Sequence, residues 1–127
     1  MDGSPRLYDV APDGEAINPH RLSHEIGRVG ADWAQKKHAA DLLEKSTRAV
    51  LAQITNRCRE QDPELTRKEA EDRALGSDEY LSHIYAAVDA RRDANLARVK
   101  LDALNAMVEA IRSAEATKRA EIRSFHR

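Results

Sequence analysis

The longest regular pattern of apolar and polar positions lies in residues 78–125, which contain neither proline nor glycine. Apolar side chains recur there at steps of three and four residues, as they do in an amphipathic helix. One row is Leu81, Tyr85, Val88, Leu96, Val99, Ala103, Met107 and Ala110, and a second row beside it is Ala97, Leu101, Leu104, Val108 and Ile111. Between residues 96 and 111 the two rows cover about half of the helix circumference. One antiparallel neighbour would bury a narrower stripe, so we expect a second neighbour from another copy of the chain.

A second long helix is predicted over residues 19–60. Asn18 followed by Pro19 is typical of a helix start, because asparagine caps the first free N–H groups and proline suits the first helical position. Apolar residues then follow at a spacing close to a heptad seam, and Lys36 and Thr47 fill its two gaps.

A short helix is predicted between the two long ones, over residues 63–75. Asp62-Pro63 repeats the cap-plus-proline signal, and Thr66 and Glu69 have the spacing of a capping box. Two long helices joined by so short a connector fold back on each other. We therefore predict an all-α fold, a long antiparallel helical hairpin with a short connecting helix, which assembles as a helical-bundle oligomer.

The pattern divides the chain into a flexible N-terminal arm, residues 1–18, and a helical hairpin domain, residues 19–127. The first 17 residues hold two prolines and two glycines among acidic side chains. Such a composition is typical of a segment without regular structure.

Composition narrows the functional classes. The chain has 127 residues, about one domain, of which 41% are hydrophobic and 34% charged. With so few aromatic residues, this is the composition of a helical bundle. The single cysteine excludes an internal disulfide, and no apolar run approaches the roughly 18 residues of a membrane span. We expect a soluble cytoplasmic protein that does not contact membranes.

The last helical turns carry the most informative charge pattern. The formal net charge of the whole chain is −1, yet the cations of these turns line up along one helix face. Arg112, Arg119, Arg123 and Arg127 share this face with Ala116, and Lys118 lies beside it. Arginine contacts phosphate through two parallel hydrogen bonds and stays charged at any working pH, so the stripe suits a nucleic-acid backbone. The alternative, which composition alone favours, is a solvated face whose cations stabilise the end of the helix dipole.

Assembly is predicted to use the widest apolar part of the same helix. The candidate oligomer interface comprises Leu96, Leu101, Leu104, Val108 and Ile111.

Catalysis is not expected. His20 and His24 are one helical turn apart, but no third ligand follows at a suitable spacing, so we predict no metal site. The chain has no glycine-rich phosphate loop, and a long hairpin offers little concavity for a small substrate. We predict a protein that is not an enzyme and has no cofactor.

The helical pattern also resembles a known family. Ser77 and Tyr80 give an S-x-x-Y start to the second long helix, which is alanine-rich and ends in arginines. The likeness is closest in residues 86–124, with Ala-Ile-Arg-Ser at 110–113. In these features the chain is similar to the UvsY-type recombination mediators of phages, which are small helical proteins.

The resemblance implies an oligomer that binds single-stranded DNA and helps to load a strand-exchange recombinase while displacing a single-strand binding protein. It also implies the cytoplasm of a bacterial host. The positions that it carries over as strand-binding are Arg112, Lys118, Arg119 and Arg123. The alternative function is that of a structural or adaptor protein, which assembles through the same hairpins and binds protein partners only.

Overall fold

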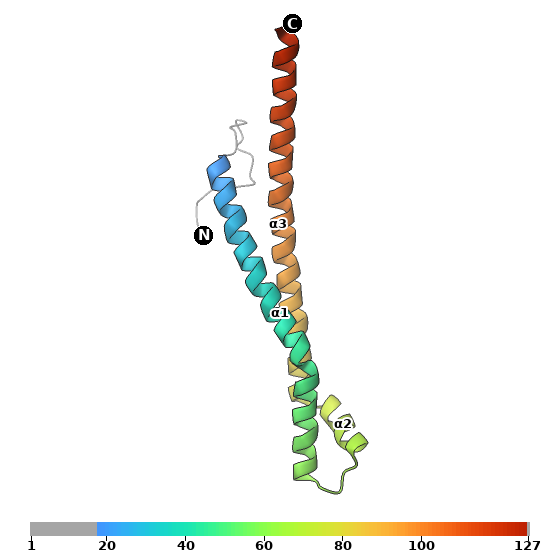
Figure 1. Ribbon diagram of the computed structural model, residues 1–127. Coiled ribbons are helices and arrows are strands. Elements are labelled where there is room, and N and C mark those ends of the chain that lie inside the picture. The colour runs from blue at the N-terminus through green and yellow to red at the C-terminus, as the bar shows by residue number, and fades with distance from the viewer. Residues whose placement is uncertain (1–17, 127) are drawn as a thin grey trace. The chain divides into compact units, whose positions relative to one another are not determined.

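A computed structural model describes residues 18–126, which form three helices in chain order (Figure 1). They are α1 (Pro19–Gln61), α2 (Arg67–Leu75) and α3 (Asp78–Phe125). No strand occurs among the described residues, so the predicted all-α class is confirmed. Arg127 and all of the predicted arm except Asn18 lie outside the described part of the chain.

Both long helices begin at the predicted capping residues. Asn18 Oδ1 accepts a hydrogen bond from the backbone N–H of His20 at 3.0 Å. Ser77 Oγ accepts one from the N–H of Tyr80 at 3.2 Å. These side chains satisfy N–H groups that have no partner within a first helical turn. Neither long helix is interrupted along its length.

The connecting helix begins later than predicted. Thr66, not Asp62, is its N-cap: Thr66 Oγ1 accepts from the N–H of Glu69 at 3.2 Å and donates to a Glu69 carboxylate oxygen at 2.9 Å. Residues 63–65 form a turn instead, in which the N–H of Leu65 donates to the carbonyl of Asp62 at 3.2 Å. The predicted start at residue 63 is therefore wrong, because the capping hydrogen bond forms between Thr66 Oγ1 and the N–H of Glu69, so the helix begins after Thr66 and not after Asp62.

By its internal contacts the chain forms two compact units. The first unit comprises Met1–Trp33 and Ala97–Arg127, and its described part contains the start of α1 and the second half of α3. The second unit, Ala34–Leu96, contains the rest of α1, all of α2 and the first half of α3.

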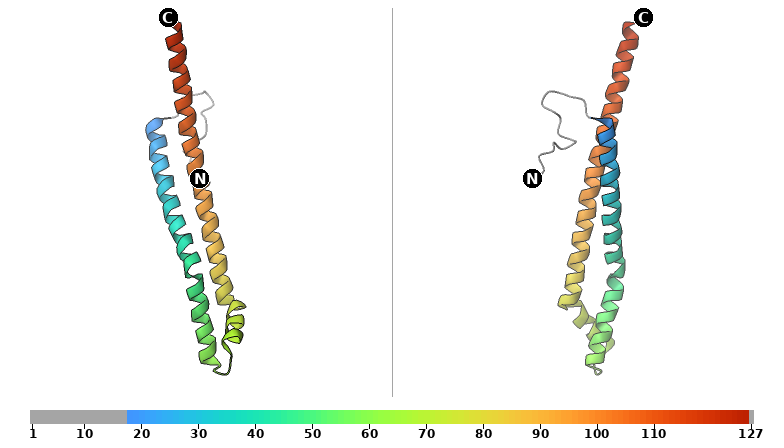
Figure 2. Two further views of the ribbon diagram at one scale, coloured as in Figure 1. Left: turned by 45° about the vertical axis from the view of Figure 1, so that its right-hand side comes forward. Right: turned by 90° about the vertical axis from the view of Figure 1, so that its left-hand side faces the viewer.

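In the first unit, the core is a narrow apolar seam between α1 and α3. Leu22, Val29 and Leu104 are buried with 3%, 6% and 3% of their surfaces exposed. Partly buried neighbours pack around them: Ile26, Leu101, Met107, Val108 and Ile111. The start of α1 lies beside α3 in both views of Figure 2. Full burial of one leucine side chain is worth about 1.5–3 kcal/mol, so this seam is the main source of packing energy in the unit.

In the second unit, buried small residues bring the helices close together. The fully buried alanines are Ala40 on α1 together with Ala70 and Ala74 on α2. A polar contact joins α1 to α3 at Thr47, one of the two gaps in the predicted seam. His83 Nε2 lies 3.0 Å from Thr47 Oγ1 and 2.9 Å from the carbonyl oxygen of Leu43. The two helices are thus antiparallel in this unit, with polar as well as apolar contacts.

An ion-pair network reinforces the same contact. Arg91 on α3 binds both Asp41 and Glu44 on α1, with its guanidinium nitrogens 2.5 Å from Asp41 and 2.6–2.8 Å from Glu44. Lys37 adds a bond to Asp41 at 3.0 Å. Hydrogen bonds from Arg91 and then Lys37 lower the pKa of Asp41 from 3.8 to about 2. The hydrogen bonds from Arg91 also lower the pKa of Glu44.

The lowered pKa values predict a pH-dependent contribution to stability. Each carboxylate is held charged in the folded chain, so the network stabilises the fold above the ordinary pKa values. This contribution is lost as the pH falls from about 4 towards 2. Arg91→Gln should therefore lower the melting temperature at pH 7, and its difference from the parent should shrink towards pH 2, as measured by circular dichroism.

The matched control is Arg92→Gln, since the ion pair that Arg92 forms within the described residues is with Asp89 of its own helix, at 3.9 Å. This change should leave the melting temperature nearly unaltered at every pH, because exposed pairs within one helix contribute little. If the difference in melting temperature between Arg91→Gln and the parent stays constant from pH 7 to pH 2, this result would contradict the proposed role of the network.

Candidate nucleic-acid interface

Within the first unit, α3 continues beyond the first residue of α1 (Figures 1 and 2). Pro19, which begins α1, lines the same groove as Arg112 and Glu115 of α3. Every residue from 116 to the end of α3 at Phe125 is exposed, as is residue 126 after it. We call residues 116–126 the C-terminal overhang, which spans about 16 Å at the helical rise of 1.5 Å per residue.

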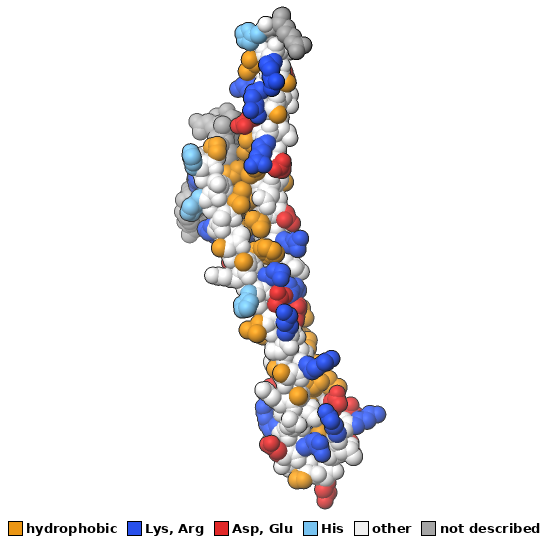
Figure 3. Space-filling model, viewed as in Figure 1, with side chains coloured by type: hydrophobic (Ala, Val, Ile, Leu, Met, Phe, Trp, Pro, Cys, Tyr) orange, Lys and Arg blue, Asp and Glu red, His pale blue; other side chains and the backbone are white. Residues whose placement is uncertain are grey.

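The overhang is basic. It carries Lys118, Arg119 and Arg123 against one acidic residue, Glu121. None of these three cations forms an ion pair with another residue in the range 18–126. Figure 3 shows basic side chains gathered along this end of α3. Their charges therefore remain available to a ligand.

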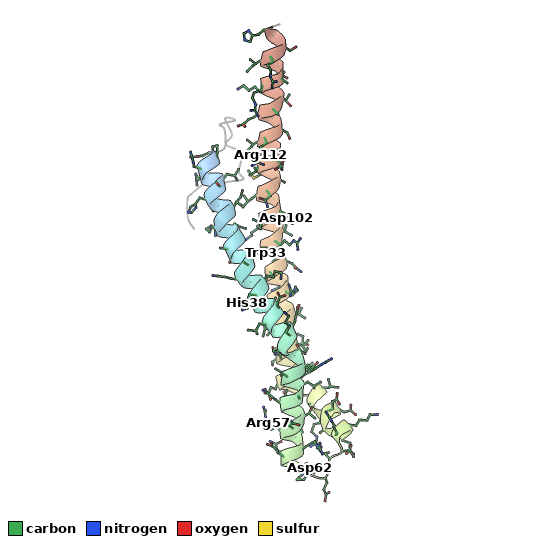
Figure 4. The ribbon with its side chains drawn as sticks, in the orientation of Figure 1. Trp33, His38, Arg57, Asp62, Asp102 and Arg112 are labelled. Carbon is green, nitrogen blue, oxygen red and sulfur yellow. The ribbon has the colours of Figure 1, made fainter. Side chains whose placement is uncertain are left out.

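Arg112 differs from the other predicted strand-binding residues. Its guanidinium donates to Glu109 at 3.2 Å, and both side chains are 71% exposed. Figure 4 places Arg112 on α3 at the level of the first turns of α1. It is thus the member of the predicted stripe that lies below the overhang and already has a partner. Arg127, the last member, lies outside the described residues.

Two large apolar side chains accompany the cations of the overhang. Ile122 is 50% exposed and Phe125 is 90% exposed. An exposed aromatic ring among cations is a typical arrangement for stacking on an unpaired base. Trp33, the other aromatic residue in the described part of the unit, is half-buried and lies under Arg98, whose guanidinium carbon is 5.9 Å from the ring centre. Phe125 is therefore the stronger candidate for base stacking.

Beside the start of the overhang, α1 and α3 enclose an open groove of about 520 Å³. Its floor is apolar and its rim is polar, with residues of both helices in each. The lining comprises Pro19, Leu22, Ser23, Ile26, Asn105, Val108, Glu109, Ile111, Arg112 and Glu115. Glu109 and Glu115 on the rim disfavour a phosphate there, so the overhang is the better phosphate-binding surface of this unit.

The residues predicted for an oligomer interface fall into two groups. Leu101, Leu104, Val108 and Ile111 pack against α1 within the chain. Leu96, by contrast, is 56% exposed. In a single chain, only Leu96 of the predicted set presents most of its side chain to a partner.

Most of the first apolar row of α3 faces solvent instead. In the second unit Leu81, Tyr85, Val88 and Leu96 are 40%, 67%, 60% and 56% exposed. Steps of four, three and eight residues place them on one side of the helix, away from the buried Ala87 and Ala94. We call these four residues the outer face of α3. The width of the apolar arc signalled such a second surface, but both rows are apolar, so the pattern did not reveal which one packs inward.

Other predicted features can be located in the described part of the chain. His20 and His24 are both exposed, and no group of three or more potential metal ligands occurs among residues 18–126. None of the helices formed by these residues is both long and apolar enough to cross a membrane.

Comparison with known protein families, curated proteins and solved structures gives no match to this chain.

Proposed function

We propose that this chain is a self-assembling, non-enzymatic protein that binds single-stranded nucleic acid through the C-terminal overhang of α3. The observation that supports this proposal is a set of exposed cations, Lys118, Arg119 and Arg123, which have no acidic partner in the described part of the chain and lie near an exposed Phe125. Cations supply affinity for phosphates without sequence preference, and the aromatic ring favours bases that are not paired.

Assembly would make so small a surface effective. Three cations on one chain bind phosphate weakly, but several copies together convert weak contacts into avidity. The outer face of α3 supports assembly, because a row of exposed large apolar side chains is typical of an interaction surface. Pairing of two copies through Tyr85, Val88 and Leu96 would cover this row.

The resemblance to UvsY-type mediators supplies the biological role that we propose for this binding. On that proposal the assembled protein holds single-stranded DNA while a recombinase replaces a single-strand binding protein. The second candidate is an adaptor that binds protein only, and the outer face favours it, since the same apolar row would suit a partner helix as well as a second copy. The two proposals differ in whether the overhang binds nucleic acid.

The assembly proposal predicts opposite results for the two apolar rows. Val88→Glu with Leu96→Glu should yield a monomer with unchanged helix content, because these side chains lie outside the core. Losing two apolar contacts of about 1.5–3 kcal/mol each should weaken self-association more than 100-fold. Sedimentation velocity measures the assembly, and circular dichroism measures the helix content.

Leu104→Glu is the comparison variant, since Leu104 is only 3% exposed. It should lower thermal stability by burying a charge in the seam of the first unit. The proposal fails if the unmodified protein is a monodisperse monomer at micromolar concentration. It also fails if the Val88/Leu96 variant assembles as tightly as the parent.

The binding proposal predicts a salt dependence. If each protomer makes three phosphate contacts, the logarithm of the association constant for an oligothymidylate should fall with log salt at a slope of about 2 per protomer. Changing Arg112, Arg119 and Arg123 together to alanine should flatten this slope and weaken binding to all sequences alike. Fluorescence anisotropy at several salt concentrations measures both quantities.

A matched control removes three cations elsewhere: Lys45→Ala, Lys68→Ala and Arg73→Ala, all exposed residues of the second unit. This variant has the same net charge as the Arg112/Arg119/Arg123→Ala variant, but it should bind the oligothymidylate nearly as tightly as the parent. Equal losses in the two variants would mean that overall charge alone governs binding. No binding by the parent at low salt would favour the adaptor.

A further inference from the structure

A second basic surface lies in the second unit, between α1 and α2. There the two helices enclose a hollow of about 350 Å³. Its lining comprises Arg48, Leu51, Ala52, Thr55, Asn56, Arg59, Arg67 and Glu71. The α1 residues recur at steps of three and one, so they form one face of that helix over three turns. Packing of the buried Ala70 and Ala74 holds α2 in place as the other wall.

Three arginines dominate the charge of this hollow. Arg48 and Arg59 come from α1 and Arg67 from the first turn of α2, against the single carboxylate of Glu71. All three arginines are exposed, and none is ion-paired with a residue in the described part of the chain. Elsewhere in the same unit, Arg57 and Arg91 do bind carboxylates across helices. The three arginines therefore line an open hollow and have no ion-pair partner among residues 18–126.

We propose that this hollow binds a linear run of phosphate groups. Guanidinium groups match phosphate oxygens in geometry as well as charge. Arg48 and Arg59 are eleven residues apart on α1, about 16 Å along its axis. This separation exceeds the size of one phosphate but suits several in a row, with Arg67 reaching them from the other wall. A polyphosphate or the backbone of a nucleic-acid strand carries this chemistry.

The uncharged residues of the hollow fit such a ligand. The Thr55 hydroxyl already donates to the carbonyl of Leu51 at 2.7 Å, so it contributes shape and no free donor. Asn56 is exposed and its amide can donate to a phosphate oxygen. The Glu71 carboxylate repels a bound phosphate, so it limits the affinity of the hollow for phosphate groups. Removing this charge therefore gives a distinctive test of the proposal.

This inference concerns residues outside the overhang and does not depend on the function proposed above. The basic hollow also contrasts with the local sequence, because residues 61–79 are acidic overall, with seven acidic and three basic side chains. The docking of α2 on α1 combines Arg67 of this acidic segment with two arginines of the preceding helix.

The test uses the full chain and two probes, tripolyphosphate and a twelve-nucleotide oligothymidylate, with titration calorimetry as the measurement. Arg48→Gln with Arg59→Gln should raise the dissociation constant for tripolyphosphate at least about tenfold, since two charge-assisted contacts are lost. Glu71→Gln should lower it several-fold, because removing a like charge favours the anion. A structural role for these residues would not produce opposite signs.

Two control variants match these changes outside the hollow. They are Arg73→Gln on α2 and Glu64→Gln in the preceding turn, and both should leave tripolyphosphate binding unaltered. The oligothymidylate arm is run in the Arg112/Arg119/Arg123→Ala background, which removes two of the three overhang cations and Arg112 beside them. A further loss on changing Arg48 and Arg59 there identifies a strand as a ligand, whereas a loss confined to tripolyphosphate identifies a smaller polyphosphate.

The proposal is overturned if Arg48→Gln with Arg59→Gln binds tripolyphosphate as tightly as the parent, or if Glu71→Gln weakens binding. If the Arg112/Arg119/Arg123→Ala variant keeps the oligothymidylate affinity of the parent, the proposed function is rejected. That result would not bear on the proposal that the hollow binds phosphate groups.

Discussion

The arrangement of this protein depends on how much apolar surface one helix can cover on another. In the first unit α1 covers a single stripe of α3, whose centre is Leu104 against Leu22 and Val29. That contact covers the second apolar row and, of the first row, Met107, because an antiparallel neighbour touches only one side of a helix. Most of the first row in this unit consequently meets solvent, as the 64% exposure of Val99 illustrates. In the second unit the outer face of α3 is likewise exposed, and a partner that covered it would bury the most apolar surface there.

The second unit solves its packing differently. Apart from Ile54, the buried apolar residues of its core are alanines, so the helices approach closely but bury little apolar area for each residue. The contacts between α1 and α3 are completed by Thr47 with His83 and by Arg91 with Asp41 and Glu44. Exposed ion pairs add little energy, but paired groups on both helices favour one register over its alternatives. Polar contacts here specify alignment where apolar contacts alone would not.

The sequence predicts the helices well because their ends depend on local chemistry. Asn18 and Ser77 cap α1 and α3 as expected, since a cap involves neighbours two or three residues away. The start of α2 is ambiguous in the sequence because two cap signals lie close together, and the helix is capped by Thr66. The inward row of α3 and the basic hollow could not be read from periodicity. Both depend on which helix faces which, a property of contacts between segments distant in the chain.

The two candidate phosphate surfaces follow from where arginines find partners. Arg91 points at two carboxylates across the helix contact, and its charge is used to align the fold. Arg119 and Arg48 have no such carboxylate among the described residues, so their charges stay available although the net charge of the chain is −1. A phosphate run is attracted by the nearest cations, since screening in salt limits the field of distant acids to about 10 Å. Local pairing, and not total charge, therefore decides which surfaces of this chain attract an anion.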